Sequence, residues 1–337
     1  MKKILLTIIY IFVHTLLFGQ DFQLSQFYSA PSLLNPGLAG ASGGTRVGLN
    51  ARNQWSLIGH PIKVNALSLD HYFSDFNSGI GIVAITEKAG SGALKNQKLG
   101  LIYSYNLSIS DKWKLRTGLQ FAFASRSLNS ADLLFGDQIH QDAITGTQET
   151  ISGRMVKNYF DFSGGTVLSR ENFWIGLSAF HLNNPNVSFT ERTSELPLLL
   201  SLQGGYKFII ESGSVKNSYD QSNEKSLTPT FLYKAQGAFR QLDLGVYMDF
   251  EPVVLGVWYR GVPGNEMLSS KGREAVVLLA GATYKEFRFG YSYDITVSKL
   301  SVTNSGGAHE ISCSYVFKEK QSRKPKVKYR RLPCPVF

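Results

Sequence analysis

The sequence predicts an all-β protein, a transmembrane antiparallel β-barrel of about 14 strands. Three observations predict it. Apolar and polar residues alternate with period two over long segments. Several of these segments run for about 9 to 14 residues, which is the length that a tilted strand needs to cross a bilayer. The 337 residues include 32 Gly, 16 Tyr and 22 Phe but only 18% charged residues, a composition typical of many strands and turns.

The stretch FRFGYSYDI shows the alternation. Phe287, Phe289 and Tyr291 share one face of a strand, and Arg288 and Gly290 share the other. The same sorting occurs in LDLGVYMDF, LRTGLQFAF and EISCSYVF. A soluble β-sandwich would also alternate, but its strands usually run for about 5 to 6 residues. The second face here carries Gly, Ser, Asp, Asn and Arg, as a wet or polar barrel lumen would.

Fourteen segments carry this pattern, and an even number suits a closed bacterial barrel. We therefore expect the barrel to occupy residues 45–318. Its strands are expected near residues 45–55, 61–73, 79–88, 96–108, 112–125, 156–169, 172–181, 198–210, 228–236, 238–250, 252–261, 273–285, 286–295 and 307–318.

An even strand number also places both ends of the barrel on one side of the membrane, the periplasmic side. Connections after even-numbered strands should then be short, as SDFNS, SDK, SREN and YKEF are. Connections after odd-numbered strands should be longer, and residues 126–155 form the longest. The polar connection at residues 211–226 departs from this rule because it would be periplasmic and yet is long. It is either an insertion or a sign that the strand count shifts there.

Residues 1–19 resemble a secretory signal peptide. Lys2 and Lys3 precede an apolar run at residues 4–18, and a small residue, Gly19, precedes a plausible cleavage site. The alternative is a retained N-terminal anchor. No Cys follows the cleavage site, so the sequence does not predict a lipoprotein. A cleaved signal and a barrel together predict an outer-membrane protein with both termini in the periplasm.

The segment at residues 20–44 precedes the first expected strand and contains SQFYSAPSLLNPGLAG. Its prolines exclude it from the barrel wall, and it is too apolar to remain in water. We expect it to fold back into the lumen or along the periplasmic mouth. Pro36 and Gly40 would turn the chain into the wall, and the side chains packed inside would be those of Phe27, Tyr28, Leu33 and Leu34. The alternative is a simple leader that binds nothing.

The sequence carries no recognisable catalytic or metal-binding motif. The histidines form no HExxH pair, no GxSxG nucleophile elbow occurs, and the glycine pairs lack the context of a phosphate loop. Asp70 and His71 are neighbours in a strand and point to opposite faces. We therefore expect no enzyme activity, no metal and no cofactor. Cys313 and Cys334 are interpreted as independent thiols, although the cell envelope would permit a disulfide.

The net charge of +10 is concentrated at the C-terminus. Residues 318–337 contain eight Lys or Arg and one Glu, and the signal peptide holds two more Lys, so the rest of the chain is nearly neutral. This distribution argues against a nucleic-acid partner. Residues 319–337 are predicted to form a basic periplasmic tail that docks on a partner. The alternative is an arm that lies against anionic phosphates without a specific partner.

Several motifs together resemble the PorP/SprF family of Bacteroidetes outer-membrane proteins. The first is QDFQLSQFYSAPSLLNPGLAG, with its SQ, aromatic, LNP and AG elements. The others follow in order as RNQW, GLSAFHLNNP, GYKF, GVWYRG, GYSYD and SGGAHE, and the chain closes on RRLPCPVF. The resemblance covers nearly the whole chain after the signal peptide, and it is specific in combination although each motif is short.

The resemblance implies a barrel of the type IX secretion system, which exports adhesins, gliding-motility proteins and surface enzymes. It implies three kinds of partner: a secreted client protein with a C-terminal targeting domain, ring and lipoprotein components of the machine, and outer-membrane lipid. The competing hypotheses are a passive diffusion channel or hydrophobic-solute transporter and, third, an enzyme built on a barrel.

Two sets of residues are the candidate partner-binding residues. In the N-terminal segment they are Gln26, Phe27, Tyr28, Leu34, Asn35, Pro36 and Gly40. In the tail they are Lys326, Lys328, Arg330, Arg331, Leu332, Pro333, Pro335 and Phe337.

Overall fold

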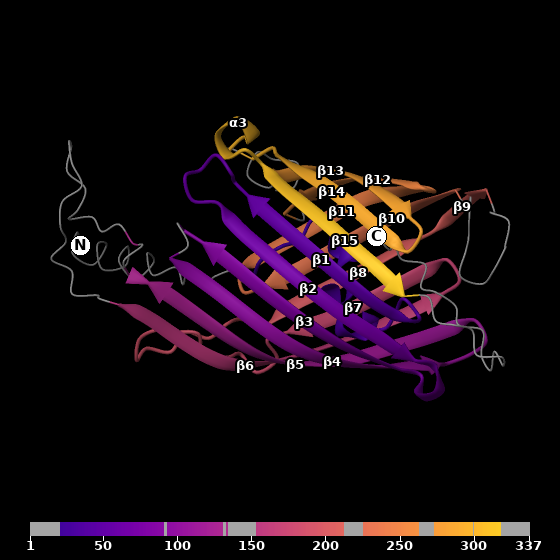
Figure 1. Cartoon of the computed structure of the whole chain (residues 1–337), viewed down its shortest axis with the longest axis horizontal. Coiled ribbons are helices and arrows are strands. Elements are labelled where there is room, and N and C mark those ends of the chain that lie inside the picture. The colour runs from indigo at the N-terminus through magenta and orange to yellow at the C-terminus, as the bar shows by residue number, and fades with distance from the viewer. Residues whose placement is uncertain are drawn as a thin grey trace, which may run out of the picture.

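The protein forms a closed antiparallel β-barrel (Figure 1). The computed structural model describes residues 21–90, 93–130, 133, 153–211, 225–262, 273–298 and 300–317. Consecutive positions of the wall pair with one another, the last strand pairs with the first, and Phe317 lies opposite Thr45 where the wall closes. The structure therefore confirms the predicted barrel and excludes the β-sandwich.

The wall has fourteen strand positions, as predicted. The strands β8 (Leu199–Tyr206) and β9 (Phe208–Glu211) are separated only by Lys207, and both pair with β10 (Lys225–Gln236), so they form one position. The strands are β1 (Thr45–Gln54), β2 (Ile62–Phe73), β3 (Ser78–Ala89), β4 (Leu94–Ser108), β5 (Trp113–Asn129), β6 (Arg154–Arg170), β7 (Phe173–Phe180), β8 (Leu199–Tyr206), β9 (Phe208–Glu211), β10 (Lys225–Gln236), β11 (Phe239–Phe250), β12 (Val253–Gly261), β13 (Arg273–Tyr284), β14 (Phe287–Thr296) and β15 (Ala308–Phe317).

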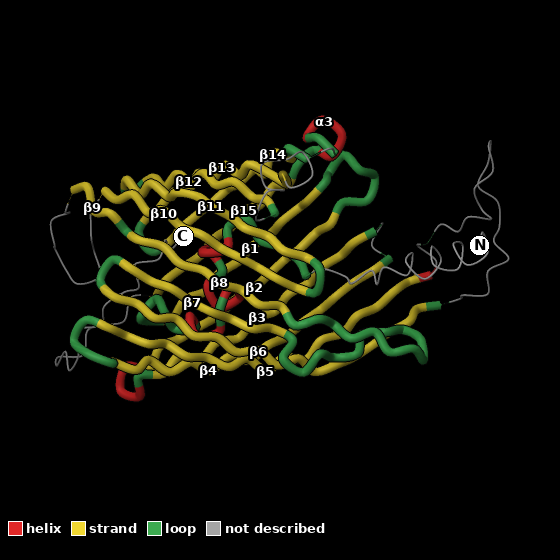
Figure 2. Tube along the Cα trace, turned by 180° about the vertical axis from the view of Figure 1, so that it is seen from behind, coloured by secondary structure: helices red, strands yellow, loops and turns green. Residues whose placement is uncertain are grey.

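The two ends of the barrel differ in their connections. At one end, called the turn end, the connections described are short, and they comprise residues 74–77, 109–112, 171–172, 251–252 and 285–286. The opposite end, called the loop end, carries longer connections such as residues 55–61 and 181–198 (Figures 1 and 2). Residues 212–224 join β9 to β10 at the turn end and lie outside the described residues. The strand count does not shift at this connection.

The outer face of the wall is apolar. Alternate side chains point outward and are each more than about a third exposed, as lipid-facing residues of a membrane barrel are. They include Leu49, Leu67, Ile80, Ile82, Leu99, Leu101, Leu119, Phe121, Phe162, Leu177, Leu244, Leu255, Leu278, Phe289 and Ile311. Exposed aromatic residues ring the turn end, as at the interfaces of such barrels, and they include Phe73, Phe76, Tyr206, Phe208, Phe250, Tyr284, Phe287 and Phe317.

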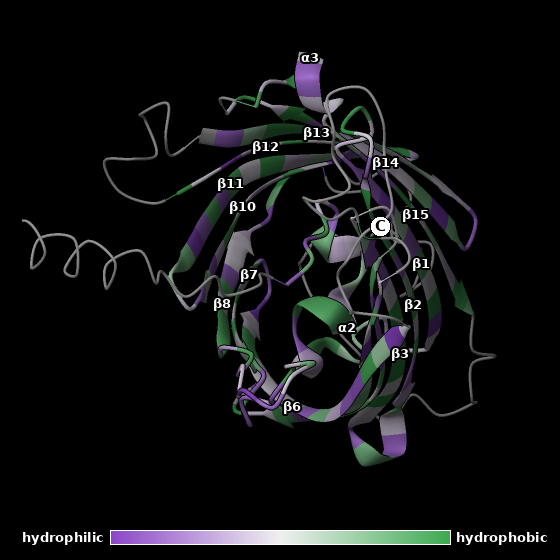
Figure 3. Ribbon diagram, turned by 90° about the vertical axis from the view of Figure 1, so that its left-hand side faces the viewer, coloured by the Kyte–Doolittle hydropathy of each residue, from purple (hydrophilic) through white to green (hydrophobic). Residues whose placement is uncertain are grey.

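The helices of the described chain are single turns. They are η1 (Phe27–Ser29), α2 (Pro31–Leu34), η2 (Pro36–Leu38), η3 (Ser74–Phe76) and α3 (Val302–Ser305). None of these described helices is long and apolar enough to span a membrane. The first three lie inside the barrel, where α2 is visible in a view along the axis (Figure 3).

The lumen is occupied by residues 21–44 (Figure 3), and many of the inward polar residues are buried. The expected position of the N-terminal end of the barrel needs correction. The ends of the wall, Thr45 and Phe317, lie together at the turn end, but Asp21 lies beside His181 and Gln236 at the loop end. The first described residue and the last therefore lie at opposite ends of the barrel, because the chain crosses the lumen before the wall begins.

Candidate functional site

Residues 21–44, called the luminal segment below, run through the barrel from the loop end to the turn end (Figures 2 and 3). At the loop end, the Asp21 amide donates a hydrogen bond to Gln236 Oε1 over 3.0 Å. At the turn end, the Gly40 amide donates to Asp70 Oδ1 over 2.9 Å. The prolines prevent this segment from joining a strand ladder, because Pro lacks the backbone donor that a ladder requires. Its backbone is instead satisfied by short helical turns and by side chains of the wall.

An aromatic cluster holds the middle of the luminal segment. Phe27 and Tyr28 pack against Trp174, Tyr247 and Trp258, which point inward from three strands. The Tyr28 ring lies 5.9 Å from both Trp174 and Tyr247 in edge-to-face contacts, and the Phe27 ring lies 6.0 Å from Trp258. Each such pair contributes roughly 0.5–1.5 kcal/mol beyond the burial of its area. The predicted position of Phe27 and Tyr28 inside the barrel agrees with these contacts.

Ser25 lies at the centre of a buried ion network. Its hydroxyl donates to Asp294 Oδ2 over 2.6 Å and accepts hydrogen bonds from Arg52 Nη1 at 2.8 Å and Arg260 Nη2 at 3.2 Å. A serine hydroxyl has one donor and two acceptor sites, so this side chain is fully used. The two guanidinium groups also bind carboxylates of the wall: Arg52 contacts Asp294 at 2.8 Å, and Arg260 contacts Asp294 and Asp243 at 3.1 Å each.

Glu310 fixes the backbone at the same level. Its two carboxylate oxygens accept hydrogen bonds from the amides of Ser25 at 2.6 Å and Gln26 at 3.1 Å. The Gln26 side chain in turn donates to the Glu310 carbonyl at 2.8 Å and accepts from Ser312 Oγ at 2.6 Å. Glu310 is completely buried. A buried carboxylate is stable only when it is paired and hydrogen-bonded, and the luminal segment supplies two of its donors.

Asn35 anchors the segment nearer the turn end. Its side-chain amide donates to the carbonyls of Thr166 and Leu177, both at 3.1 Å, and its Oδ1 accepts from the Gly37 amide at 2.9 Å. The two bonds to the wall need a carboxamide, because a carboxylate could not donate to these carbonyls. The wall has a glycine where the segment approaches it, because a Cβ on Gly118 would lie only 2.4 Å from the Pro36 backbone.

The segment leaves the lumen through a tight turn. Gly40 has a φ of +71°, a left-handed conformation that glycine adopts without steric cost. Asp70 accepts from its amide, and Arg46 lies 3.9 Å from the same carboxylate. Arg46 also donates to the carbonyl of Ser29. One wall arginine therefore links the middle of the segment to its exit.

A second ionic contact holds the segment at the loop end. His181 lies between two carboxylates, with Nε2 2.7 Å from Asp21 and Nδ1 3.0 Å from Asp161. Lys98 approaches the second of these carboxylates to 2.5 Å. Burial lowers the pKa of His181, but the negative charges of Asp21 and Asp161 outweigh that effect and raise its pKa to about 9. The imidazole is therefore a cation at neutral pH, with both nitrogens able to donate.

Asp21 experiences the complementary effect. Burial raises the pKa of its carboxyl group, but the charge of His181 and the hydrogen bond to it lower the pKa to about 2. The pair is therefore ionic over the whole neutral range. It ties the first described residue of the chain to the loop that follows β7.

The structure brings the predicted N-terminal residues together, but it buries them. Gln26, Phe27, Tyr28, Leu34, Asn35, Pro36 and Gly40 all contact the inside of the barrel. A direct role for them in binding a partner stays a prediction. The predicted tail residues, from Lys326 to Phe337, lie outside the described residues.

The wall residues of the ion network were missed by sequence reasoning. They occupy inward positions of the alternation, and this face was interpreted only in general terms, as the face of a wet or polar lumen; the four are Arg52, Arg260, Asp294 and Glu310. Each of the four also lies in a motif of the family resemblance, namely RNQW, GVWYRG, GYSYD and SGGAHE. In the structure, these scattered motifs meet at the SQ dipeptide that begins with Ser25. The signal available in the sequence was that all four charged residues lie in motifs of the same family resemblance.

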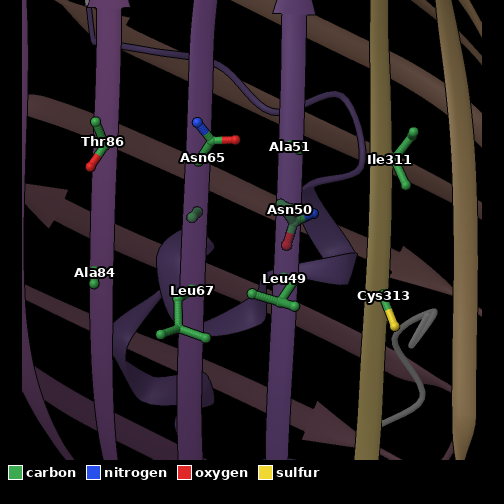
Figure 4. Close-up of a pocket in the computed structure, with 10 residues that line it drawn as sticks. Leu49, Asn50, Ala51, Asn65, Leu67, Ala84, Thr86, Ile311 and Cys313 are labelled. Carbon is green, nitrogen blue, oxygen red and sulfur yellow. The ribbon is translucent and has the colours of Figure 1, made fainter.

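No group of three or more His, Cys, Asp or Glu within the described part of the chain could hold a metal ion. A hollow of about 440 Å³ lies on the outer face of β15, β1, β2 and β3 (Figure 4). Small side chains such as Ala51 and Ala84 leave it open between Leu49 and Leu67, and Cys313 contributes its thiol. Its lining contains no charged residue. It therefore belongs to the lipid-facing surface.

The ion network predicts the effect of one substitution. Glu310→Gln should destabilise the folded barrel by about 3–5 kcal/mol, because removing one buried partner leaves Arg52 with less compensation. Hydrogen exchange at the Ser25 and Gln26 amides should accelerate about a hundredfold or more. The matched control is Glu211→Gln, which removes an exposed pair with Lys225 and should cost less than about 1 kcal/mol. Equal exchange in both variants would contradict the network's role.

The contact at the loop end predicts a pH dependence. The folded-state pKa of His181, about 9, exceeds its ordinary value of 6.5, so its stabilising effect is complete below pH 6.5 and is lost as pH rises through 9. Asp21 has a lowered pKa, so its effect is complete above pH 3.8 and is lost as pH falls through 2. A spin label at Gln23 should be immobile at pH 6 and mobile at pH 9.5. In His181→Gln the label should be mobile at both values, and a pH-independent wild-type signal would contradict the assignment.

The chain matches one family model and has distant structural neighbours. A search of curated proteins found no match. Similar solved structures include the outer membrane protein Omp33 of Acinetobacter baumannii, at 6% identity and a TM-score of 0.43, covering 81% of this chain and 98% of that one. The toluene transporter TbuX of Ralstonia pickettii is 9% identical with a TM-score of 0.45, covering 86% and 94%. The family model for the type IX secretion system membrane protein PorP/SprF matches residues 16–315. The chain therefore belongs to the PorP/SprF family of type IX secretion system membrane proteins.

Proposed function

We propose that this protein is a non-enzymatic outer-membrane component of the type IX secretion system that binds a secreted client. In this proposal, the barrel binds the C-terminal targeting domain of one client protein and docks on the periplasmic parts of the machine. The client is then secreted or anchored at the surface, where it serves as an adhesin or a gliding protein. Family membership supports the assignment to the secretion system. The client and the docking partner are the finer parts of the proposal.

The observation that carries the proposal is the occupied lumen. The luminal segment fills the centre of the barrel. Charged side chains of the wall, those of Arg52, Arg260 and Glu310, hold it there through hydrogen bonds to Ser25. A barrel whose function is binding does not need an open pore. The energy for export would then come from other parts of the machine, and this chain would contribute a rigid platform in the membrane.

The turn end is the end that we assign to the periplasm. Short turns face the periplasm in bacterial barrels of this type, and β15 ends there at Phe317. The basic tail at residues 319–337 would therefore begin on the periplasmic side. The tail contains seven Lys or Arg, two of them in its closing motif RRLPCPVF. This composition suits an acidic surface beside an apolar contact.

The alternative is a passive diffusion channel or a transporter of hydrophobic solutes. It would require a path beside the luminal segment or release of that segment. Planar bilayers containing the purified protein distinguish the two functions. Stable, solute-dependent conductance by the wild-type protein would support the channel.

Deletion of residues 319–337 tests the docking role. The wild-type protein, recovered from its own membranes in mild detergent, should bring down one large secreted protein together with periplasmic ring components. The deletion should lose at least half of both while inserting normally, because the charged contact is gone. A matched control keeps the tail length and RRLPCPVF but replaces the basic residues before Arg330 with Gln, which separates charge from the apolar contact.

Mass spectrometry of the recovered material and display of the client on the cell surface are the measurements. Unchanged client display in the deletion would contradict docking through the tail. A barrel that brings down no other protein in either form would favour the diffusion channel.

A further inference from the structure

Three lysines lie side by side on the outer face of the barrel, near the loop end. Lys63 of β2 lies directly opposite Lys88 of β3, and Lys88 lies directly opposite Lys95 of β4. Residues directly opposite in an antiparallel pair have Cβ atoms about 4.5–5.5 Å apart. All three side chains continue the outward alternation of their strands. We call these three residues the lysine row.

The lysine row has no compensating negative charge nearby. None of its members forms an ion pair or a hydrogen bond with a residue that the structure describes. The strands β1 to β5 contain two acidic residues, Asp70 and Glu87, and both occupy inward positions. Residues 55–61 and 90–93, which join these strands at the loop end, contain no Asp or Glu. Like charges directly opposite in a sheet are destabilising, so an anion from outside the chain would stabilise this part of the wall.

The outward residues of the three strands change in the same order toward the loop end. Successive outward positions lie about 7 Å apart along a strand. The first of three positions is apolar, the second is polar and uncharged, and the third is the lysine. The series are Leu67, Asn65 and Lys63 on β2, Ala84, Thr86 and Lys88 on β3, and Leu99, Gln97 and Lys95 on β4. This order follows the layers of a bilayer, from hydrocarbon through the interfacial region to the headgroups.

The hollow of about 440 Å³ lies directly below the lysine row on two of the same strands. Its lining includes Asn65 and Thr86, each two residues from a lysine of the row. Figure 4 shows these two side chains next to each other, with Leu67 and Ala84 below them. A lipid with its headgroup at the lysine row would therefore have this hollow beside its acyl chains.

The charge of the lysine row indicates the headgroup. Clusters of basic residues beside a membrane bind anionic headgroups, and Lys binds phosphate as a compact point charge. A phosphate monoester carries roughly −1.5 to −2 charges at neutral pH and three acceptor oxygens. It therefore matches three adjacent ammonium groups better than a phosphodiester with a single charge does.

We propose that the lysine row binds a lipid of the outer leaflet that carries a phosphate monoester, with one acyl chain of that lipid in the hollow. The phosphate contacts the ammonium groups of Lys63, Lys88 and Lys95. Asn65, Thr86 and Gln97 face the hydroxyl and carbonyl groups between the phosphate and the chains. The assignment to the outer leaflet rests on the membrane orientation proposed above, which places the loop end outside the cell.

The test is native mass spectrometry of the full-length protein in nonionic detergent, titrated with monophosphoryl lipid A. This probe should form a one-to-one complex and should bind at least about tenfold more tightly than its dephosphorylated form, because the charge-assisted contacts need the phosphate. Combining Lys63→Gln, Lys88→Gln and Lys95→Gln should remove this preference and leave binding of the dephosphorylated form unchanged.

The matched control removes three exposed lysines at the turn end. Lys112→Gln, Lys225→Gln and Lys285→Gln together change the net charge by the same amount, and they should alter binding less than about twofold because surface charges at that distance are screened. A second variant, Ala84→Phe, fills the hollow from the lipid side. It should weaken monophosphoryl lipid A at least about threefold without lowering thermal stability, since position 84 points away from the core.

Other ligands identify what the lysine row recognises. Phosphatidylglycerol, a phosphodiester, should bind more weakly than monophosphoryl lipid A, and equal binding would overturn the assignment to a phosphate monoester. Inorganic phosphate should not compete at equal concentration, and efficient competition would assign the row to a soluble anion. Equal binding of monophosphoryl lipid A by the lysine variant and the wild type would overturn the site itself. The assay contains neither client nor secretion machinery, so its failure would leave the proposed client binding untouched.

Discussion

Buried charges inside the barrel are the constraint on which the rest of the structure depends. The wall directs Arg52, Arg260, Asp294 and Glu310 into a space from which water is largely excluded, and charges in such a space require partners. The wall charges pair with one another, but Ser25 and the neighbouring backbone amides complete their hydrogen bonds. The wall and the luminal segment therefore stabilise each other, and neither is fully satisfied alone.

This mutual dependence explains the local chemistry of the segment. The hydroxyl of Ser25 uses all three of its hydrogen-bonding sites on wall charges. Asn35 uses both of its amide hydrogens on strand carbonyls, and its oxygen caps the following turn. Gly118 has no side chain where Pro36 approaches most closely. The aromatic cluster around Tyr28 stabilises the segment by burying apolar surface, which does not depend strongly on direction. The polar contacts fix the position of the segment along the barrel axis.

The wall could be predicted from the sequence because its signal is local. Every strand must present one face to lipid, so residues such as Phe287 and Phe289 recur at period two regardless of which strand lies beside them.

The contacts of the luminal segment are not local. Ser25 contacts Asp294 and Glu310, which are more than 250 residues away in sequence. The alternation of a strand shows which residues point inward, but it does not show which inward residues of different strands lie at the same height along the barrel axis. An inward Arg in an open lumen has the same sequence pattern as Arg260, which is why the polar face alone did not distinguish a wet lumen from a filled one. The crossing of the lumen was hidden for the same reason, since the sequence places Asp21 close to Thr45 and the fold places them at opposite ends.

The central claim is that the luminal segment occupies the barrel in the membrane. Cysteine cross-linking tests it most directly, with Ser29→Cys and Asn50→Cys introduced into a chain whose Cys313 and Cys334 are replaced by Ser. These two side chains are in contact in the structure, whereas Ser178 contacts a different part of the segment, at Leu34, and provides the control pair with Ser29→Cys. The account predicts a disulfide between positions 29 and 50 in intact cells under mild oxidation, and none in the control pair. Failure of the first pair to cross-link, or equal cross-linking of both, would contradict it.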